Sequence, residues 1–181
     1  MSRYAAYLRA INVGGHTVPM AALRRHFEDL GCADVRTVIA SGNVLFSSSA
    51  RSSAALERRI AQHLAARLGY EVATFLRTEE ELVSIAAHRP FGRADTERPG
   101  HSLFVGFHEH AADAGCRRRV LGLATDLDAL RLRGREVYWL CRGRTSDSRI
   151  YGGGLEKALG QPVTLRNVTT VRKIAEMLAG A

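Results

Sequence analysis

The sequence predicts an α+β fold made of two tandem ferredoxin-like subdomains, the second carrying extra helices. Three observations lead to this prediction. Short apolar strands and amphipathic helices follow the order β-α-β-β-α-β over residues 1–77. The same order returns over residues 78–181 once a connecting and a terminal helix are set aside. A length of 181 residues with 46% hydrophobic side chains suits two small subdomains with a core each.

In the first subdomain, proline and glycine mark where elements begin and end. Pro19 suits the first turn of a helix, where its missing N–H would have no partner. Gly31 and Gly69 are natural stops for two amphipathic helices. The segment Ala40-Ser41-Gly42-Asn43 predicts the tight turn of a hairpin. We therefore expect strands at 4–8, 35–39, 44–46 and 72–76, and helices at 20–30 and 56–68.

The second subdomain repeats this order with additions. Thr78 and Glu81 have the spacing of a capping box, which predicts the start of a connecting helix. Gly134-Arg135 separates two apolar runs and predicts a hairpin. We expect helices at 78–88, 111–123, 155–159 and 169–178, strands at 103–107, 130–133, 136–141 and 163–165, and a loop at 89–100.

The composition predicts a cytoplasmic protein without a membrane segment. No run of about 18 apolar residues occurs, and the first residues lack the apolar stretch of a secretory signal. The three cysteines, Cys32, Cys116 and Cys141, are widely spaced and odd in number. That pattern is neither a disulfide framework nor a zinc site, so we expect three reduced thiols.

The net charge of +8 raises the possibility of a nucleic-acid partner. All the cations except Lys157 and Lys173 are arginines, a bias typical of a GC-rich genome. They are also scattered, and the densest run, Arg117-Arg118-Arg119, lies in a predicted helix where a solvated face is the usual explanation. Nucleic-acid binding is therefore an alternative interpretation, not the leading one.

The loop before the first helix predicts a site for a small anion. Gly14 and Gly15 lead into a helix N-terminus, whose N–H groups and dipole favour negative charge. Arg9 and Asn12 precede them with a cation and an amide. We expect the first and third strands to run parallel, which would bring Arg51 and its neighbouring serines to the same edge. The hairpin turn is then expected at the opposite edge. An ordinary strand-to-helix turn is the structural alternative.

Two further polar segments lie in the second subdomain. Arg166 and Asn167 stand between the last strand and the last helix, where they would form a cationic and amide clamp, or Asn167 would simply cap the helix. Arg149 precedes the three glycines 152–154, which predict a segment that moves or closely approaches another group. We expect this segment and Arg166 to share a pocket.

No combination of residues names a reaction. His108 and His110 alternate on an extended segment, but no third ligand is evident, so no metal site is predicted. No Ser-His-Asp, Cys-His or paired-carboxylate pattern has a usable context, and no cofactor is predicted. Whether the protein is an enzyme stays open at this point.

Several blocks of the sequence together resemble a bacterial family catalogued as a domain of unknown function (number sixteen ninety-seven), whose members begin YLRGINVGG. The blocks are Tyr7-Leu8-Arg9-Ala10-Ile11-Asn12-Val13-Gly14-Gly15, Val18-Pro19-Met20, Ser41-Gly42-Asn43-Val44-Leu45-Phe46, Leu155-Glu156-Lys157-Ala158-Leu159-Gly160 and Thr164-Leu165-Arg166-Asn167. The resemblance covers nearly the whole chain and implies two tandem ferredoxin-like subdomains. It implies no established reaction, cofactor or partner.

The sequence departs from this family at three positions that bear on a ligand. His16 stands where the family has a basic, Lys-containing stretch, and the loop is shorter. Arg149 stands where a Lys is usual, and Val168 replaces a usual Trp. If these positions contact a ligand, its affinity or identity differs in this chain.

The leading functional expectation is a protein that binds a small anionic ligand between its two subdomains. The motivation is that polar residues gather in loops that core packing does not require. The alternatives are a nucleic-acid-binding protein that uses its basic surface, and a regulatory or dimerisation module. The chain is expected to be a monomer or a homodimer.

Overall fold

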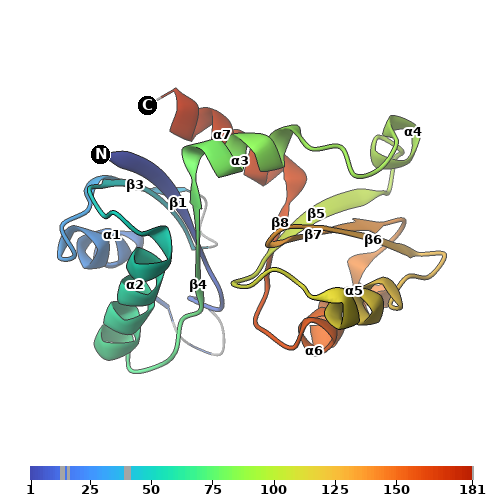
Figure 1. Cartoon of the computed structure of the whole chain (residues 1–181), viewed down its shortest axis with the longest axis horizontal. Coiled ribbons are helices and arrows are strands. Elements are labelled where there is room, and N and C mark those ends of the chain that lie inside the picture. The colour runs from blue at the N-terminus through green and yellow to red at the C-terminus, as the bar shows by residue number, and fades with distance from the viewer. Residues whose placement is uncertain (13–14, 16, 39–41, 181) are drawn as a thin grey trace. The chain divides into compact units, whose positions relative to one another are not determined.

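Two four-stranded antiparallel sheets with helices organise the chain, as the computed structural model in Figure 1 shows. Residues 1–12, 15, 17–38 and 42–180 are described. The strands are β1 (Ser2–Leu8), β2 (Ala33–Val38), β3 (Asn43–Ser48), β4 (Thr74–Thr78), β5 (Ser102–Phe107), β6 (Asp128–Arg133), β7 (Glu136–Cys141) and β8 (Thr164–Asn167). The α-helices are α1 (Met20–Glu28), α2 (Ser53–Leu68), α3 (Glu79–Ala87), α4 (Arg93–Thr96), α5 (Ala114–Leu121), α6 (Leu155–Leu159) and α7 (Val168–Ala179). A 3₁₀ turn, η1 (Thr145–Asp147), and a wide helical turn, η2 (Ile150–Gly154), precede α6.

The order of strands in the sheets confirms the predicted fold class. The first sheet has the order β2-β3-β1-β4, and the second has the order β6-β7-β5-β8. All neighbouring strands are antiparallel. Each half is therefore a β-α-β-β-α-β unit of the ferredoxin-like kind.

Most helix boundaries follow from the capping residues seen in the sequence. The Ser52 hydroxyl accepts a hydrogen bond from the Ala55 N–H at the start of α2, and Gly69 ends α2 in the left-handed conformation at φ 79°. The predicted capping box of α3 is confirmed, because Glu81 accepts from the Thr78 N–H at 2.9 Å and Thr78 accepts from the Glu81 N–H at 3.2 Å. No helix in the described part of the chain is long and apolar enough to cross a membrane.

Three elements of the second half differ from the prediction. The last strand, expected at 163–165, is β8 and extends to Asn167, so Arg166 and Asn167 lie within the strand and not after it. The segment expected as the loop 89–100 contains the short helix α4. The helix expected at 111–123 covers only Ala114–Leu121, because the Asp113 side chain accepts from the Cys116 N–H and sets the start of the helix there.

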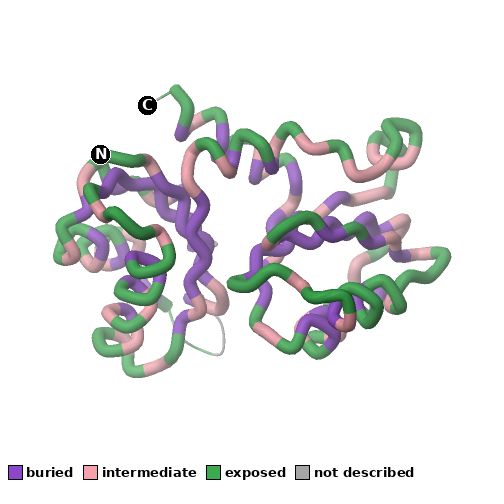
Figure 2. The backbone as a smooth tube through the Cα atoms, viewed as in Figure 1, coloured by how far each residue is buried: buried purple, intermediate pink, exposed green. Residues whose placement is uncertain are grey.

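Each sheet has its own apolar core on the face covered by helices. The first core joins α1 and α2 to the sheet and includes Tyr4, Leu23, Phe27, Val44, Phe46, Ile60, Leu64 and Leu76. The second joins α5 and α6 to its sheet and includes Cys116, Val120, Leu130, Val137, Trp139, Ile150, Leu155 and Leu159. Figure 2 shows that the strands are buried along most of their length. Side chains on the opposite sheet faces are buried as well, among them Tyr7, Arg77, Tyr138 and Arg166.

By their internal contacts, the described residues form two compact units. The first unit is Met1–Ala86 with Arg172–Ala181, and the second is Ala87–Val171. Helix α3 groups with the first sheet, where Glu79 forms a two-pronged ion pair with Arg3 of β1 at 2.7 and 2.8 Å. Met177 and Leu178 line the same cavity as Leu45 of β3. The sequence-based boundary at residue 78 assigns α3 and residues 172–181 to the second subdomain. The contacts instead assign α3, up to Ala86, and residues 172–181 to the first unit.

Candidate functional site

Several chain connections of the first unit meet at one edge of its sheet. The Leu8 N–H, at the end of β1, donates to the Gly42 carbonyl in the hairpin turn at 2.8 Å. The next N–H, of Arg9, donates to the Ala73 carbonyl before β4 at 2.9 Å. We call this region the loop edge, and its described residues are 9–12, 15, 17–19, 42 and 70–73.

The backbone of the loop edge adopts conformations that few residues accept. Ala10 has a φ of 59°, although it is not a glycine, and Gly15 and Gly42 have φ values of 86° and 76°. A Cβ on Gly42 would lie 2.7 Å from the Ile11 Cγ2 atom, so only glycine fits between the turn and the loop. The Tyr70 hydroxyl donates to the Ile11 carbonyl at 3.0 Å and holds the loop in place.

Polar groups of the loop edge lie at the entry to α1. The Asn12 Oδ1 accepts from the Val18 N–H at 2.8 Å and bridges the loop. Pro19 occupies the N-cap of α1 and provides no side-chain hydrogen bond to the first turn. Arg9 is half-buried, whereas Asn12 and Gly15 are exposed. A permanent cation therefore lies in a loop that leads into the positive end of a helix dipole.

The predicted partnership of Arg51 with this loop is wrong. Strands β1 and β3 run antiparallel, with Ser2 opposite Ser48 and Tyr7 opposite Asn43. The link after β3, which contains Arg51, therefore lies at the edge away from Arg9. Gly42 of the hairpin turn, expected at that far edge, lies at the loop edge instead, and Ala40 and Ser41 of the turn lie outside the described residues. Helix α1 carries the chain back to the start of the sheet, so β2 runs in the same direction as β1. The hairpin then reverses the chain, so β3 runs antiparallel to β1.

Gly14 and His16, which the sequence placed in the same loop, lie outside the described residues. The loop edge is therefore built here from Arg9, Asn12 and Gly15 and from the hairpin glycine Gly42.

Arg166 and Asn167 have structural contacts of their own. The Arg166 Nη1 donates to the Thr164 Oγ1 at 2.7 Å and to the Leu165 carbonyl at 2.9 Å, and the residue is only 9% exposed. The Asn167 Oδ1 accepts from the Thr169 N–H at 2.9 Å and from its hydroxyl at 2.8 Å. Asn167 therefore caps α7, which was the structural alternative.

The structure reveals a counterpart of Arg166 that the sequence analysis missed. Arg77 of β4 is opposite Ala5 of β1, as Arg166 of β8 is opposite Val105 of β5. Arg77 is 1% exposed and donates to the Leu76 carbonyl at 2.7 Å. The signal was present in the sequence as Leu76-Arg77-Thr78 and Leu165-Arg166-Asn167, in which the residue after the arginine caps the next helix.

Arg149 and Arg166 do not share a face of the second sheet. Ile150 and Leu155 on either side of the glycines pack into the core that α5 and α6 cover, together with Leu165. Arg166 follows Leu165 in β8, so its side chain points to the other face. Arg149 itself is exposed. The expected pocket between the glycine segment and Arg166 is therefore not formed within this unit.

Among the described residues of the strands, no aromatic side chain is exposed for stacking bases. Tyr4 packs into the first core, and Tyr7 on the opposite face is 0% exposed. Tyr138 in the second sheet is 1% exposed and lies in edge-to-face contact with His88. RNA-recognition domains of this fold stack bases on exposed sheet aromatics. These side chains are therefore not placed for that mode of binding.

Burial disfavours the reactive thiolate form of two of the three cysteines. Cys32, Cys116 and Cys141 are free and buried. Burial raises the pKa of Cys32, against the lowering effect of Arg59. Burial also raises the pKa of Cys141, against a backbone hydrogen bond with Gly143. Because the thiolate is the reactive form, neither of these two side chains is activated as a nucleophile.

Comparison with known proteins gives a family and a fold. Residues 1–138 match the family described as "Protein of unknown function (DUF1697)". None of the curated proteins is significantly similar in sequence. Among solved structures, the chain is similar to the conserved bacterial protein SP0830 from Streptococcus pneumoniae, with a TM-score of 0.79, 25% sequence identity and 98% of each chain covered.

Proposed function

The chain belongs to the DUF1697 family of proteins of unknown function, and from that premise we propose that it binds a small anionic molecule at the loop edge of its first sheet. The observation that carries the proposal is the close contact of Ile11, in the Arg9–Asn12 segment, with the hairpin glycine Gly42, which lies 30 to 33 positions further along the sequence. The ligand class is a phosphate or a carboxylate on a small organic molecule.

Backbone strain at the loop edge supports a functional role. Ala10 is held in the left-handed region at φ 59°, which costs a non-glycine residue about 1–2 kcal/mol. Such strain persists where the surrounding structure enforces it, and it gathers at binding sites. Here the Leu8–Gly42 and Arg9–Ala73 hydrogen bonds fix the backbone just before Ala10, and the Tyr70–Ile11 hydrogen bond fixes it just after.

The charge at the loop edge sets the class of ligand. Arg9 carries a planar guanidinium, a group that forms paired hydrogen bonds with carboxylates and phosphates. The first turn of α1 adds N–H groups without a side-chain cap and the positive end of the helix dipole. The hydrogen bond from the Val18 N–H to the Asn12 Oδ1 ties Asn12 to the residue just before the N-cap of α1.

A thermal-shift screen tests the proposal. The full chain is heated with a panel of phosphorylated and carboxylated metabolites, and the same panel is run on Arg9→Gln and on Arg118→Gln. Arg118 is an exposed arginine of α5 in the other unit and serves as a charge-matched control. A ligand at about 100 times its Kd should stabilise the wild type and Arg118→Gln by about 2.7 kcal/mol, and Arg9→Gln by much less. The absence of any stabilising anion, or equal loss in the two variants, would rule the site out.

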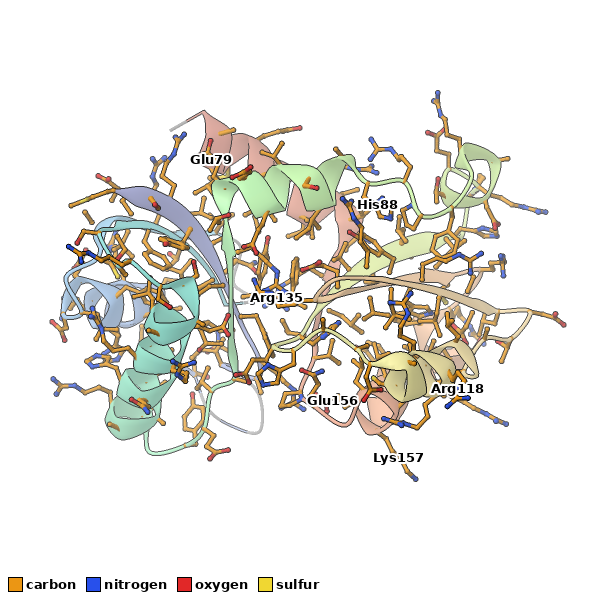
Figure 3. The ribbon with its side chains drawn as sticks, viewed as in Figure 1. Glu79, His88, Arg118, Arg135, Glu156 and Lys157 are labelled. Carbon is orange, nitrogen blue, oxygen red and sulfur yellow. The ribbon has the colours of Figure 1, made fainter. Side chains whose placement is uncertain are left out.

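Nucleic acid is the second candidate partner. The observation that favours it is that Arg118 and Lys157, on the neighbouring helices α5 and α6, both point outward in Figure 3. Other arginines of this helix pair are tied to the protein, since Arg119 donates to the Ala158 carbonyl at 3.1 Å. Retention on a DNA or RNA column that falls steeply between about 50 and 200 mM salt would favour this alternative.

A further inference from the structure

Two helices of the first unit bring three metal-binding side chains together. His26 lies in α1, Asp29 is the C-cap residue of α1, and His63 lies in α2. One ligand atom from each of the three lies within 4.8 Å of the other two. The imidazole rings of His26 and His63 are 5.6 Å apart between centroids and meet edge to face at 68°.

The helix geometry explains why these residues converge. His26 and Asp29 are three positions apart, and Asp29 keeps right-handed helical angles, so both side chains lie on one face. Helices α1 and α2 both pack on the same sheet face, where Phe27 and Leu64 are 0% exposed. Because each of these core residues directly follows one of the histidines, packing fixes the backbone that positions the imidazoles.

The two imidazoles have ring nitrogens that the protein leaves unused. The His26 Nδ1 and the His63 Nε2 are buried and have no hydrogen-bond partner. A buried nitrogen without a partner costs about 1–3 kcal/mol, so it calls for an explanation. Burial, and then the neighbouring His63 and Arg67, lower the pKa of His26, while Asp29 opposes them. Metal ions bind the neutral form of imidazole through a ring nitrogen of this kind.

We propose that His26, His63 and Asp29 bind a divalent transition-metal ion, with Zn²⁺ as the best match. Two imidazole nitrogens and one carboxylate oxygen are a ligand set found in zinc sites that keep the fourth position for water. Imidazole nitrogens disfavour Mg²⁺ and Ca²⁺, which take oxygen ligands. Ligand atoms around tetrahedral Zn²⁺ are roughly 3.4 Å apart for bonds of about 2.1 Å, so small side-chain rotations bring the three atoms into place.

The charges around the three ligands act in opposite directions. The Asp29 carboxylate attracts a cation, and Arg67, whose charge reaches His26, repels it. Asp29 is exposed and the two histidines are half-buried, so the cluster borders solvent. None of the three residues belongs to the loop edge, so this site is independent of the proposed anion site.

Metal titration of the full chain, purified without a histidine tag and stripped with a chelator, tests the site. Zn²⁺ affinity is measured by competition with a chromogenic chelator, and Co²⁺ reports coordination through its visible absorption. The variants are His26→Ala, His63→Ala and Asp29→Asn. His110→Ala is the control. It also removes one imidazole, but from an exposed position on the second unit.

We expect one Zn²⁺ per chain and a tetrahedral Co²⁺ spectrum for the wild type and for His110→Ala. Each histidine variant should weaken Zn²⁺ binding at least about ten-fold, and Asp29→Asn should weaken it less, as expected for loss of one of three ligands. Circular dichroism checks that the histidine variants fold, and the exposed Asp29 gives a variant that does not disturb the core. Equal Zn²⁺ binding by the wild type and His26→Ala/His63→Ala, or its loss in His110→Ala, would overturn the proposal.

Discussion

Gly42 lies against Ile11 so closely that no other residue fits in its place. A Cβ on Gly42 would be 2.7 Å from the Ile11 Cγ2 atom and 3.2 Å from the Leu8 Cβ atom. Gly42 of the hairpin is thus held in direct contact with Ile11 of the segment after β1. This contact is what turns two separate sequence motifs into one candidate site.

Replacing Gly42 with alanine should destabilise the protein by about 2–5 kcal/mol, because left-handed strain costs about 1–2 kcal/mol and overpacking about 1–3 kcal/mol. Gly69→Ala is the matched control, since Gly69 has a similar φ of 79° and no atom near its missing Cβ. Urea unfolding of both variants separates the two costs. Equal losses of stability in the two variants would mean that the contact with Ile11 is not tight.

Asp128→Ala should destabilise the chain by about 2–3 kcal/mol, because the change leaves buried donors without their charged acceptor. The Asp128 Oδ1 accepts from the Trp139 Nε1 at 2.7 Å and from the Ser148 Oγ at 2.8 Å. Asp126→Ala, two residues away and exposed, should change stability by less than about 0.5 kcal/mol. Urea unfolding measures both, and a loss with Asp128→Ala no larger than with Asp126→Ala would contradict the role of Asp128.

The metal-free protein should lose stability as the pH falls below about 6.5. Burial and the neighbouring His63 hold the pKa of His26 below its usual 6.5 in the folded state, so the unfolded chain binds the proton more tightly. Burial acts in the same direction on the pKa of His88. The free energy of unfolding, measured by urea titration from pH 7.5 to 5.5, should therefore fall less in His26→Gln than in the wild type or in His110→Gln. An unchanged slope in His26→Gln would contradict this assignment.

The ion pair between Arg3 and Glu79 should couple β1 to α3 by about 0.5–1 kcal/mol, because both side chains keep about a third of their surface in water. A double-mutant cycle with Arg3→Ala and Glu79→Ala measures this coupling. The pair Arg93–Glu97 of α4 is the reference, since it is much more exposed and should couple by only a few tenths of a kcal/mol. Equal coupling in the two pairs would show that partial burial of Arg3 and Glu79 adds nothing.

Local signals in the sequence predicted the elements well because their causes are local. Pro19, Gly69 and the Thr78–Glu81 capping box mark helix ends through hydrogen bonds within a few residues, and the structure has helix ends at these positions. The order of the elements then led to the ferredoxin-like fold, whose strand order is confirmed. What the sequence could not show was the short helix α4, because its few residues carry no apolar periodicity.

The candidate site was harder to predict because it depends on strand direction. The mistaken expectation that the first and third strands run parallel placed Arg51 beside Arg9 and the Gly42 turn at the opposite edge. The direction of a strand is set by its pairing with strands far away in the sequence, and local patterns of apolar and turn residues do not reveal that pairing. The meeting of His26 with His63 has the same origin, since two helices far apart in the sequence must pack before the imidazoles are neighbours.

The most direct test of the central claim is NMR mapping of the backbone amides during titration with a phosphorylated or carboxylated ligand from the thermal-shift screen. We expect saturable shifts centred on Arg9, Asn12, Gly15 and Gly42, which disappear in Arg9→Gln and persist in Arg118→Gln. Shifts that centre instead on the exposed arginines of α5, or that survive unchanged in Arg9→Gln, would contradict an anion site at the loop edge.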